Sequence, residues 1–277
     1  MSIRIVTLSE NTAGRVNLLA EWGLSILVEV DGCRILFDTG LTCSAAYNAI
    51  ALGVDLSQLD RIVLSHGHLD HTGGLLRILN MIKGEVEVIA HPDIWALKYS
   101  KPPQGSEHYI GTPFRREAAE TLGADFKLTS EPVWLSQNTV TSGEIAMTTE
   151  YEDTGSMFYV KEQGKLRPDP LLDDQALFVK SDKGLIIILG CAHRGVVSTI
   201  RHAQKLTGLE QIYAVVGGTH LIGASPERLD STIAALKGAG VRMLGVSHCT
   251  GLPASVILAR EFGQAFFFNN AGTLVNL

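Results

Sequence analysis

Short runs of β-branched and apolar residues, each bounded by turn residues, dominate the first third of the chain and predict β-strands. Helical patterns, with apolar residues three or four positions apart, fall between these runs at 43–52 and 73–82. The predicted strands cover 3–8, 25–30, 34–37, 62–64 and 86–90.

The last third of the chain repeats one order, a strand followed by a helix, three times. The predicted pairs are 185–189 with 196–206, 212–216 with 226–237, and 243–246 with 253–262. Strands that alternate with helices favour an α/β architecture built from layers of sheet and helix.

The middle of the chain, from about 99 to 170, is less regular and rich in proline and glycine. We interpret it as an inserted lid that contains one helix near 115–122, followed by hairpins. The alternative is a plain connection with no role in the site, because long irregular segments of compact domains are often, but not always, functional.

The composition is ordinary for a soluble globular protein, with 45% hydrophobic and 19% charged residues in a chain of 277. Lys and Arg number 23 against 29 Asp and Glu, which gives a formal net charge of −6, and no basic run stands out. Nucleic acid is therefore not an electrostatically favoured partner.

Neither a membrane span nor a secretory signal is expected. No apolar stretch reaches the roughly 18 residues that a spanning helix needs, and the first residues, MSIRIVTLSEN, are typical of a strand. The four cysteines Cys33, Cys43, Cys191 and Cys249 form no CxxC pair, which agrees with free thiols in a reducing compartment. We therefore expect a cytoplasmic protein.

The segment SHGHLDH, residues 65–71, places three imidazoles and a carboxylate directly after an apolar run. His66 and His68 converge on one ion most easily when the chain is extended or looped, because a helix would turn them to different faces. These side chains suit zinc, iron or manganese. Asp70 and His71 cannot easily bend back to the same ion, so they indicate a second one.

A histidine-rich surface loop without a metal is the alternative interpretation of this segment. Only nine histidines occur in 277 residues, and three of them fall here, which argues against a chance cluster. The simplest hypothesis is a dinuclear metal centre.

Three further histidines follow the three predicted strands of the last third. They are His193 in GCAHRG, His220 in GGTHL and His248 in SHCTG. In open sheets, sites form outside the carboxyl ends of strands, so these three positions could share one edge with residues 66–71.

The motif HGHLDH, with FDTG upstream at 37–40 and histidines after the later strands, resembles the metallo-β-lactamase superfamily. The three later motifs are similar to its branch of 7,8-dihydropterin-6-methyl-4-(β-D-ribofuranosyl)aminobenzene-5'-phosphate synthase-like proteins. The resemblance covers nearly the whole chain and is weakest at 99–175. It implies a single domain over 1–277 with an αββα sandwich, in which two sheets pack face to face with helices outside.

The resemblance also implies that His66 and His68 hold one ion while Asp70 and His71 hold the other. His248 matches the last histidine of the superfamily and would complete the second ion. The alternative for His248 is a hydrogen-bonded histidine at a strand end.

The remaining ligand of the first ion is less conventional. Many members carry a bridging aspartate after a strand that ends in glycine, but here Gly190 is followed by Cys191, with His193 two positions on. We assign His193 to the first ion. Cys191 is either a bridging thiolate or substrate contact, or a buried thiol that behaves as a small hydrophobic residue.

Three other residues have predicted roles near the metals. His220 follows a glycine pair that lets the backbone approach a ligand, so it could contact substrate or shuttle protons, or be an ordinary core or surface histidine. His91 is a weaker candidate for substrate binding, with a structural role as the alternative. Asp38 would orient a metal-binding histidine through its other ring nitrogen. His108 and His202 carry no motif and are expected at the surface.

Two divalent ions, zinc first and manganese or iron otherwise, would activate a hydroxide at neutral pH, with Asp70 holding its proton. The expected activity is hydrolysis of an ester, lactone or phosphodiester bond in a small molecule. For the oligomeric state we expect a homodimer. A synthase-like condensing enzyme and a non-catalytic metal or redox sensor are the alternatives.

Overall fold

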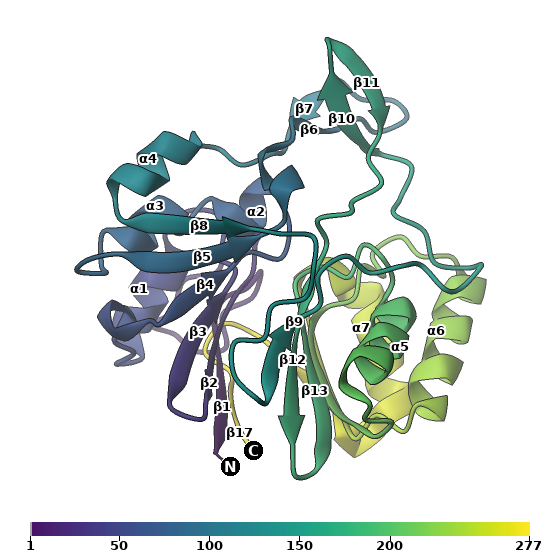
Figure 1. Cartoon of the computed structure of the whole chain (residues 1–277). Helices are drawn as coiled ribbons and strands as arrows, with labels where there is room; N and C mark the ends of the chain where they lie inside the picture. The colour runs from purple at the N-terminus through teal and green to yellow at the C-terminus, as the bar shows by residue number, and fades with distance from the viewer. Residues whose placement is uncertain (1) are drawn as a thin grey trace. The chain divides into compact units, whose positions relative to one another are not determined.

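The computed structural model describes residues 2–277, which divide into two compact units. The first unit comprises the chain up to residue 129 together with 154–173 and 270–277. The second unit comprises 130–153 and 174–269. Figure 1 labels the elements of both units.

A seven-stranded sheet organises the first unit. Strands β1 to β3 form an antiparallel meander, whereas β4, β5 and β8 continue the sheet in parallel. In sheet order the strands are β17 (Leu274–Asn276), β1 (Ile3–Ser9), β2 (Ser25–Val30), β3 (Cys33–Phe37), β4 (Arg61–Val63), β5 (Val86–Ala90) and β8 (Ala124–Leu128). The five strands predicted for this region are therefore confirmed.

The helices of the first unit are short. They are α1 (Ser44–Ala51), α2 (Leu69–Thr72), α3 (Leu75–Leu79), α4 (Arg116–Thr121) and the 3₁₀ turns η1 (Leu56–Gln58) and η2 (Pro92–Trp95). The helix predicted over 73–82 begins only at Leu75. A Cβ on Gly73 or Gly74 would lie about 2 Å from the carbonyl oxygen of Leu41 or Thr39, so both glycines serve a close backbone contact before the helix starts.

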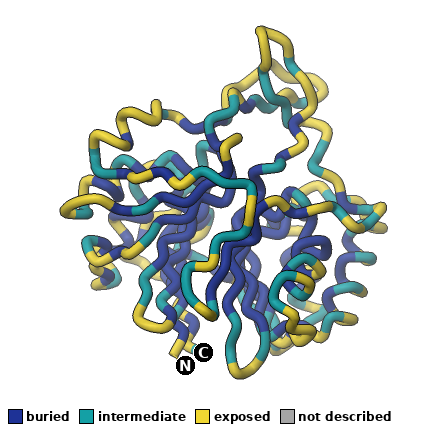
Figure 2. Tube along the Cα trace, in the orientation of Figure 1, coloured by how far each residue is buried: buried dark blue, intermediate teal, exposed yellow. Residues whose placement is uncertain are grey.

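A second, four-stranded sheet in the first unit is built from the segment predicted as a lid. Its order is β11 (Lys165–Pro168), β10 (Phe158–Glu162), β6 (Lys98–Ser100) and β7 (His108–Tyr109), all antiparallel. The expected helix near 115–122 is present as α4, and β10–β11 is a hairpin as expected. Apart from the buried Lys98, the residues of the small sheet are half-buried or exposed, as the colours of Figure 2 indicate. A lid function for this segment stays a prediction.

A six-stranded sheet organises the second unit. Its order is β16 (Phe266–Phe268), β15 (Met243–Ser247), β14 (Ile212–Gly218), β13 (Gly184–Leu189), β12 (Ala176–Ser181) and β9 (Thr139–Thr141). Strands β13 to β16 run parallel. The helices of this unit are α5 (Val196–Thr207), α6 (Pro226–Gly238), α7 (Leu252–Phe262), η3 (His248–Thr250) and η4 (Gly263–Ala265).

Each unit has its own hydrophobic core. The second core joins the apolar faces of β13 to β15 to α5, α6 and α7, which Figure 1 shows gathered beside that sheet. The core of the first unit joins the seven-stranded sheet to α1 and α3. The three strand–helix repeats predicted for the last third are confirmed, because alternate buried residues of β13, namely Leu185, Ile187 and Leu189, share one core with α5, α6 and α7.

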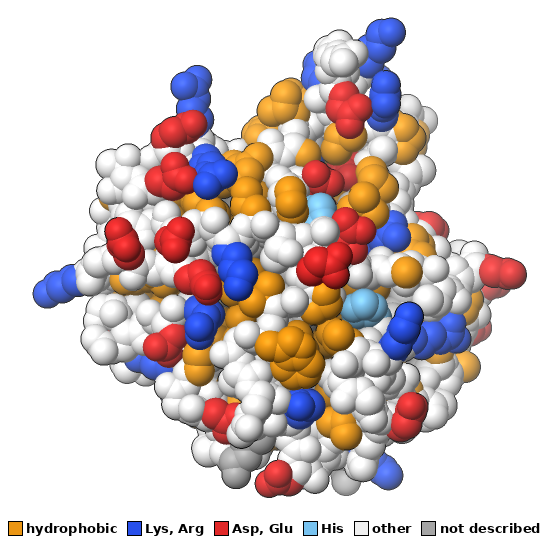
Figure 3. Space-filling model, in the orientation of Figure 1, with side chains coloured by type: hydrophobic (Ala, Val, Ile, Leu, Met, Phe, Trp, Pro, Cys, Tyr) orange, Lys and Arg blue, Asp and Glu red, His pale blue; other side chains and the backbone are white. Residues whose placement is uncertain are grey.

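None of the helices in residues 2–277 combines the length and the apolar character needed to traverse a bilayer. On the face drawn in Figure 3, Lys and Arg side chains are interspersed with Asp and Glu.

Candidate metal centre

The histidine loop follows β4 and is buried. His66 and His68 lie on extended or looped chain after this strand, as expected, and His68 immediately precedes the short helix α2, which carries Asp70 and His71. The side chains of His66, His68 and His71 are almost completely excluded from solvent. Buried imidazoles need polar partners, because polar side chains are costly to bury without them.

Gly67 permits the close packing of this loop. A Cβ at Gly67 would lie 2.7 Å from the Ile94 carbonyl oxygen and 3.1 Å from Lys98 Cε. The backbone N–H of Gly67 donates to Asp173 Oδ2 at 2.7 Å. The loop is therefore fixed through its backbone, and the histidine rings on either side of Gly67 do not have to anchor it.

Asp38 lies at the centre of a buried hydrogen-bond network, as the sequence led us to expect. It is fully buried and accepts from Ser65 N, from Ser65 Oγ and from His71 Nδ1, each at 2.7 Å. Ser65 Oγ also lies 2.9 Å from His66 Nδ1, so the hydroxyl that donates to Asp38 accepts from this ring. Both His66 and His71 then carry their proton on Nδ1, so the ring lone pair that could bind a metal is on Nε2 in each.

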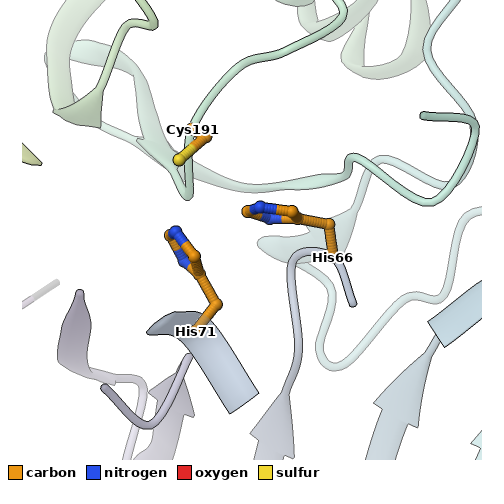
Figure 4. Close-up of side chains that lie close together, drawn as sticks. All are labelled: His66, His71 and Cys191. Carbon is orange, nitrogen blue, oxygen red and sulfur yellow. The ribbon is translucent and has the colours of Figure 1, made fainter. Parts of the chain in front are cut away.

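The ring nitrogens of the first unit are arranged as metal ligands require. His66 Nε2 and His68 Nδ1 are 3.0 Å apart. Two nitrogens bound at 2.0–2.1 Å to a tetrahedral zinc ion would be separated by about 3.3 Å. Figure 4 shows the rings of His66 and His71 next to each other. Their centroids are 4.2 Å apart. This donor set fits a divalent transition metal.

Three histidines of the second unit lie at one edge of its sheet. His193, His220 and His248 follow β13, β14 and β15, three adjacent parallel strands. The rings of His193 and His220 are 4.1 Å apart between centroids. His220 and His248 have positive φ angles of 46° and 52°, a backbone conformation that is unfavourable for residues other than glycine and often found at functional sites.

Cys191, which is also drawn in Figure 4, belongs to a sulfur-containing group within the second unit. One ligand atom each of Cys191, His248 and Cys249 lies within 4.8 Å of the others, and all three side chains are buried. Cys249 Sγ donates to the Cys191 carbonyl oxygen at 3.5 Å. A Cβ at Gly218 would lie 2.6 Å from Cys249 Sγ, so the glycine pair leaves the space that this thiol fills.

His220 has a strongly lowered pKa. Burial, followed by the positive charges of Arg228 and His248, lowers the pKa of its imidazole from 6.5 to about 4. The ring is therefore neutral at pH 7.

This shift predicts a pH dependence of folding for the metal-free protein. Between pH 6.5 and 4 the unfolded chain protonates His220 and the folded chain does not, so the free energy of unfolding should fall as the pH falls. The pKa difference alone would lower the free energy of unfolding by about 3 kcal/mol. Because the ring is partly exposed to solvent, the expected loss is smaller than this. Urea denaturation at several pH values from 7 to 4 should show a smaller loss of unfolding free energy for His220→Gln than for the wild type. Equal losses in the two proteins would contradict the lowered pKa of His220.

Other sequence candidates lie elsewhere. His91 Nδ1 accepts from Asp93 N at 3.1 Å and caps η2, which favours its structural role. His108 is exposed and lies near Ser106, as expected. His202 was expected at the surface but is half-buried, because its Nε2 bonds the Ser142 carbonyl oxygen at 2.9 Å.

Glu152, which was not among the residues predicted from the sequence, shapes the second unit. Glu152 is buried and accepts from the backbone N–H groups of Val197 and Ser198 at 2.8 and 3.0 Å, so it binds the positive end of α5. This fixes the segment that follows His193. No motif marks Glu152 in the sequence, because it lies 45 residues before the helix turn that it binds.

The chain belongs to the metallo-β-lactamase superfamily, whose family model matches residues 23–203. The expected fold is confirmed by the crystal structure of Tm1679, described as a metal-dependent hydrolase of the β-lactamase superfamily. That structure superposes with a TM-score of 0.85 at 28% identity and covers 99% of this chain and 98% of its own.

Two relatives from Methanocaldococcus jannaschii match over nearly their full length. One is 7,8-dihydropterin-6-methyl-4-(β-D-ribofuranosyl)-aminobenzene-5'-phosphate synthase, 36% identical over 99% of this chain and 96% of that protein. The other is an uncharacterised protein, 30% identical over 99% of this chain and 100% of its own length. The predicted similarity to the synthase-like branch is confirmed, and the superfamily and the named relative support an enzyme.

Proposed function

We propose that this protein is a metal-dependent hydrolase that cleaves an ester, lactone or phosphodiester bond of a small molecule at a dinuclear centre. One observation carries the proposal: the network from Asp38 through Ser65 prepares His66 and His71 to offer Nε2 lone pairs beside a third buried imidazole. The hydrolase description of Tm1679 supports it.

In this proposal, each ion takes three side chains. His66, His68 and His193 hold one ion, and Asp70, His71 and His248 hold the other. The assignment rests on the spacing of HGHLDH and on the motifs shared with the superfamily. Zinc is the first choice because imidazole and carboxylate ligands suit it, with manganese or iron as alternatives.

The chain's own residues then have distinct tasks. When bound, two divalent ions would lower the pKa of a water molecule and polarise a carbonyl or phosphoryl oxygen of the substrate. Asp70 would hold the proton of the attacking water and orient its lone pair. His220, neutral at pH 7, would contact the substrate or relay a proton. Asp38 would keep His71 in the tautomer that binds metal.

Metal analysis together with hydrolysis assays tests this function. We expect about two zinc or similar ions per chain, hydrolysis of at least one ester, lactone or phosphodiester, loss of activity on chelation, and recovery when the metal is restored. A metal-free preparation with full activity would contradict the proposal.

A second candidate is a synthase-like condensing enzyme, favoured by the 36% identity to the M. jannaschii synthase. It keeps the same metal ligands and changes the reaction. Incubation with pterin and ribofuranosyl aminobenzene phosphates separates the two candidates: a condensation product would favour the synthase, whereas hydrolysis products alone would favour the hydrolase.

The non-catalytic alternative depends on Cys191 and Cys249. Alkylation that changes the metal content of a protein inactive in both assays would favour a sensor. A cytoplasmic location, a homodimer and substrate contacts by His91 or Cys191 stay predictions from the sequence.

A further inference from the structure

A buried ion triad lies in the first unit, outside the proposed ligands. Lys98, Asp169 and Asp173 are each at most 4% exposed. Lys98 Nζ donates to Asp169 Oδ2 at 2.8 Å and to Asp173 Oδ1 at 2.9 Å. Burial alone would lower the pKa of Lys98, but the two carboxylates raise it above its ordinary value, so the lysine is charged.

The two carboxylates of the triad make nearly equivalent contacts. Each uses one oxygen for Lys98 and the other for a backbone N–H, at 2.8 Å from Leu171 N for Asp169 and at 2.7 Å from Gly67 N for Asp173. Leu171 lies two residues from Asp169, whereas Gly67 lies between His66 and His68. Of the two carboxylates, it is therefore Asp173 that hydrogen-bonds the histidine loop.

A comparable contact occurs in the second unit. Asp174 Oδ2 accepts from Arg194 N at 2.9 Å, and Arg194 directly follows His193. Asp174 is also buried. Two consecutive carboxylates thus each bind, within their own unit, the backbone next to a histidine that we assign to the first ion.

We propose that Asp173 is a positioning residue for the first metal ion: it fixes the backbone between His66 and His68, with Lys98 holding its carboxylate in place and Asp174 acting similarly beside His193. This inference rests on the proposed function. A hydrogen bond to an ionised carboxylate is shorter and about twice as strong as a hydrogen bond between two neutral groups. Such a bond is suited to holding a loop in a single conformation.

Metal binding would be sensitive to the position of the backbone at Gly67. His66 Nε2 and His68 Nδ1 come within 3.0 Å of each other, and a displaced Gly67 would change that separation. Metal affinity depends steeply on ligand geometry, and loss of a partner that orients a ligand costs about 10–100-fold in metal affinity or activity.

The test compares Asp173→Asn with Asp169→Asn. In either variant an amide replaces a carboxylate that accepts from Lys98 and from one backbone N–H, so both should lose similar stability in thermal unfolding of the metal-free protein. Zinc affinity is measured by competition with a chromophoric chelator, and Co²⁺ substitution reports ligand geometry in the visible spectrum. D173N should raise the zinc dissociation constant of one ion about 10–100-fold and alter the cobalt spectrum, whereas D169N should match the wild type.

The outcomes separate this inference from the proposed function. Equal zinc affinities and cobalt spectra in D173N and D169N, with two ions bound by the wild type, would overturn the positioning role alone. A wild type that binds no metal would overturn both. If D173N does not fold, Asp173→Glu provides the same comparison, because it keeps the charge near Lys98 and moves the carboxylate relative to Gly67 N.

Discussion

Replacement of His68 by alanine should abolish binding of one metal ion and, with it, catalysis. His68 is buried, and its Nδ1 lies 3.0 Å from His66 Nε2, so the substitution removes one of two adjacent atoms that we propose as ligands. Metal-assisted hydrolysis gains several kcal/mol from charge stabilisation by the ions, and we therefore expect kcat/KM to fall at least about 10³-fold. Elemental analysis of the purified variant should find about one ion less per chain.

His108→Ala is the matched control for His68→Ala. His108 is exposed, and its Nε2 lies 3.1 Å from Ser106 Oγ on the same surface segment. Its removal should leave metal content and activity at the wild-type level. Two ions per chain in H68A would refute the assignment of His68.

Replacement of Asp38 by alanine should have the largest effect on stability. Three buried groups, Ser65 N, Ser65 Oγ and His71 Nδ1, would lose their acceptor. Each unsatisfied buried donor costs about 1–3 kcal/mol, so the free energy of unfolding should fall by about 3–5 kcal/mol. Urea denaturation of the metal-free protein measures this loss.

Asp38→Asn separates folding from metal binding. Asparagine tolerates the φ of 60° at this position and keeps one oxygen acceptor, so the variant should fold with a smaller loss of stability. Its NH₂ group would meet His71 Nδ1 and favour the tautomer protonated on Nε2, which cannot bind metal. We expect D38N to be folded and deficient in zinc. Wild-type zinc affinity in D38N would contradict the tautomer argument.

The strands were predictable because their signal is local. Alternation and burial are encoded within the segment itself, and the predicted bounds of 25–30 and 86–90 coincide with β2 and β5. The start of the helix predicted at 73 was wrong, because Gly73 and Gly74 pack against backbone carbonyls of Leu41 and Thr39, more than 30 positions away. A periodic pattern contains no information about such a contact.

The candidate site was predictable to a similar extent. His66, His68 and Asp38 stand in recognisable motifs, and the network of Asp38 has the predicted form. Asp173 and Lys98 were not predicted, because their partners are distant in the sequence. Asp173 accepts from a residue 106 positions away, and Lys98 pairs with Asp173 over a separation of 75 positions. Long-range pairing of ordinary charged residues has no local signature in one sequence.

The backbone conformations around the site limit how far the thermostability of the protein can be raised without loss of function. Asp38, Ala192, His220 and His248 all have positive φ angles between 46° and 60°, which cost roughly 1–2 kcal/mol for each residue with a Cβ. At Ala192, His220 and His248, selection for thermostability alone would therefore favour glycine, whereas the three buried hydrogen bonds of Asp38 outweigh the strain at that position. Two of these replacements would remove a histidine of the proposed site, so a variant library screened only for heat resistance would be enriched in stable proteins without function.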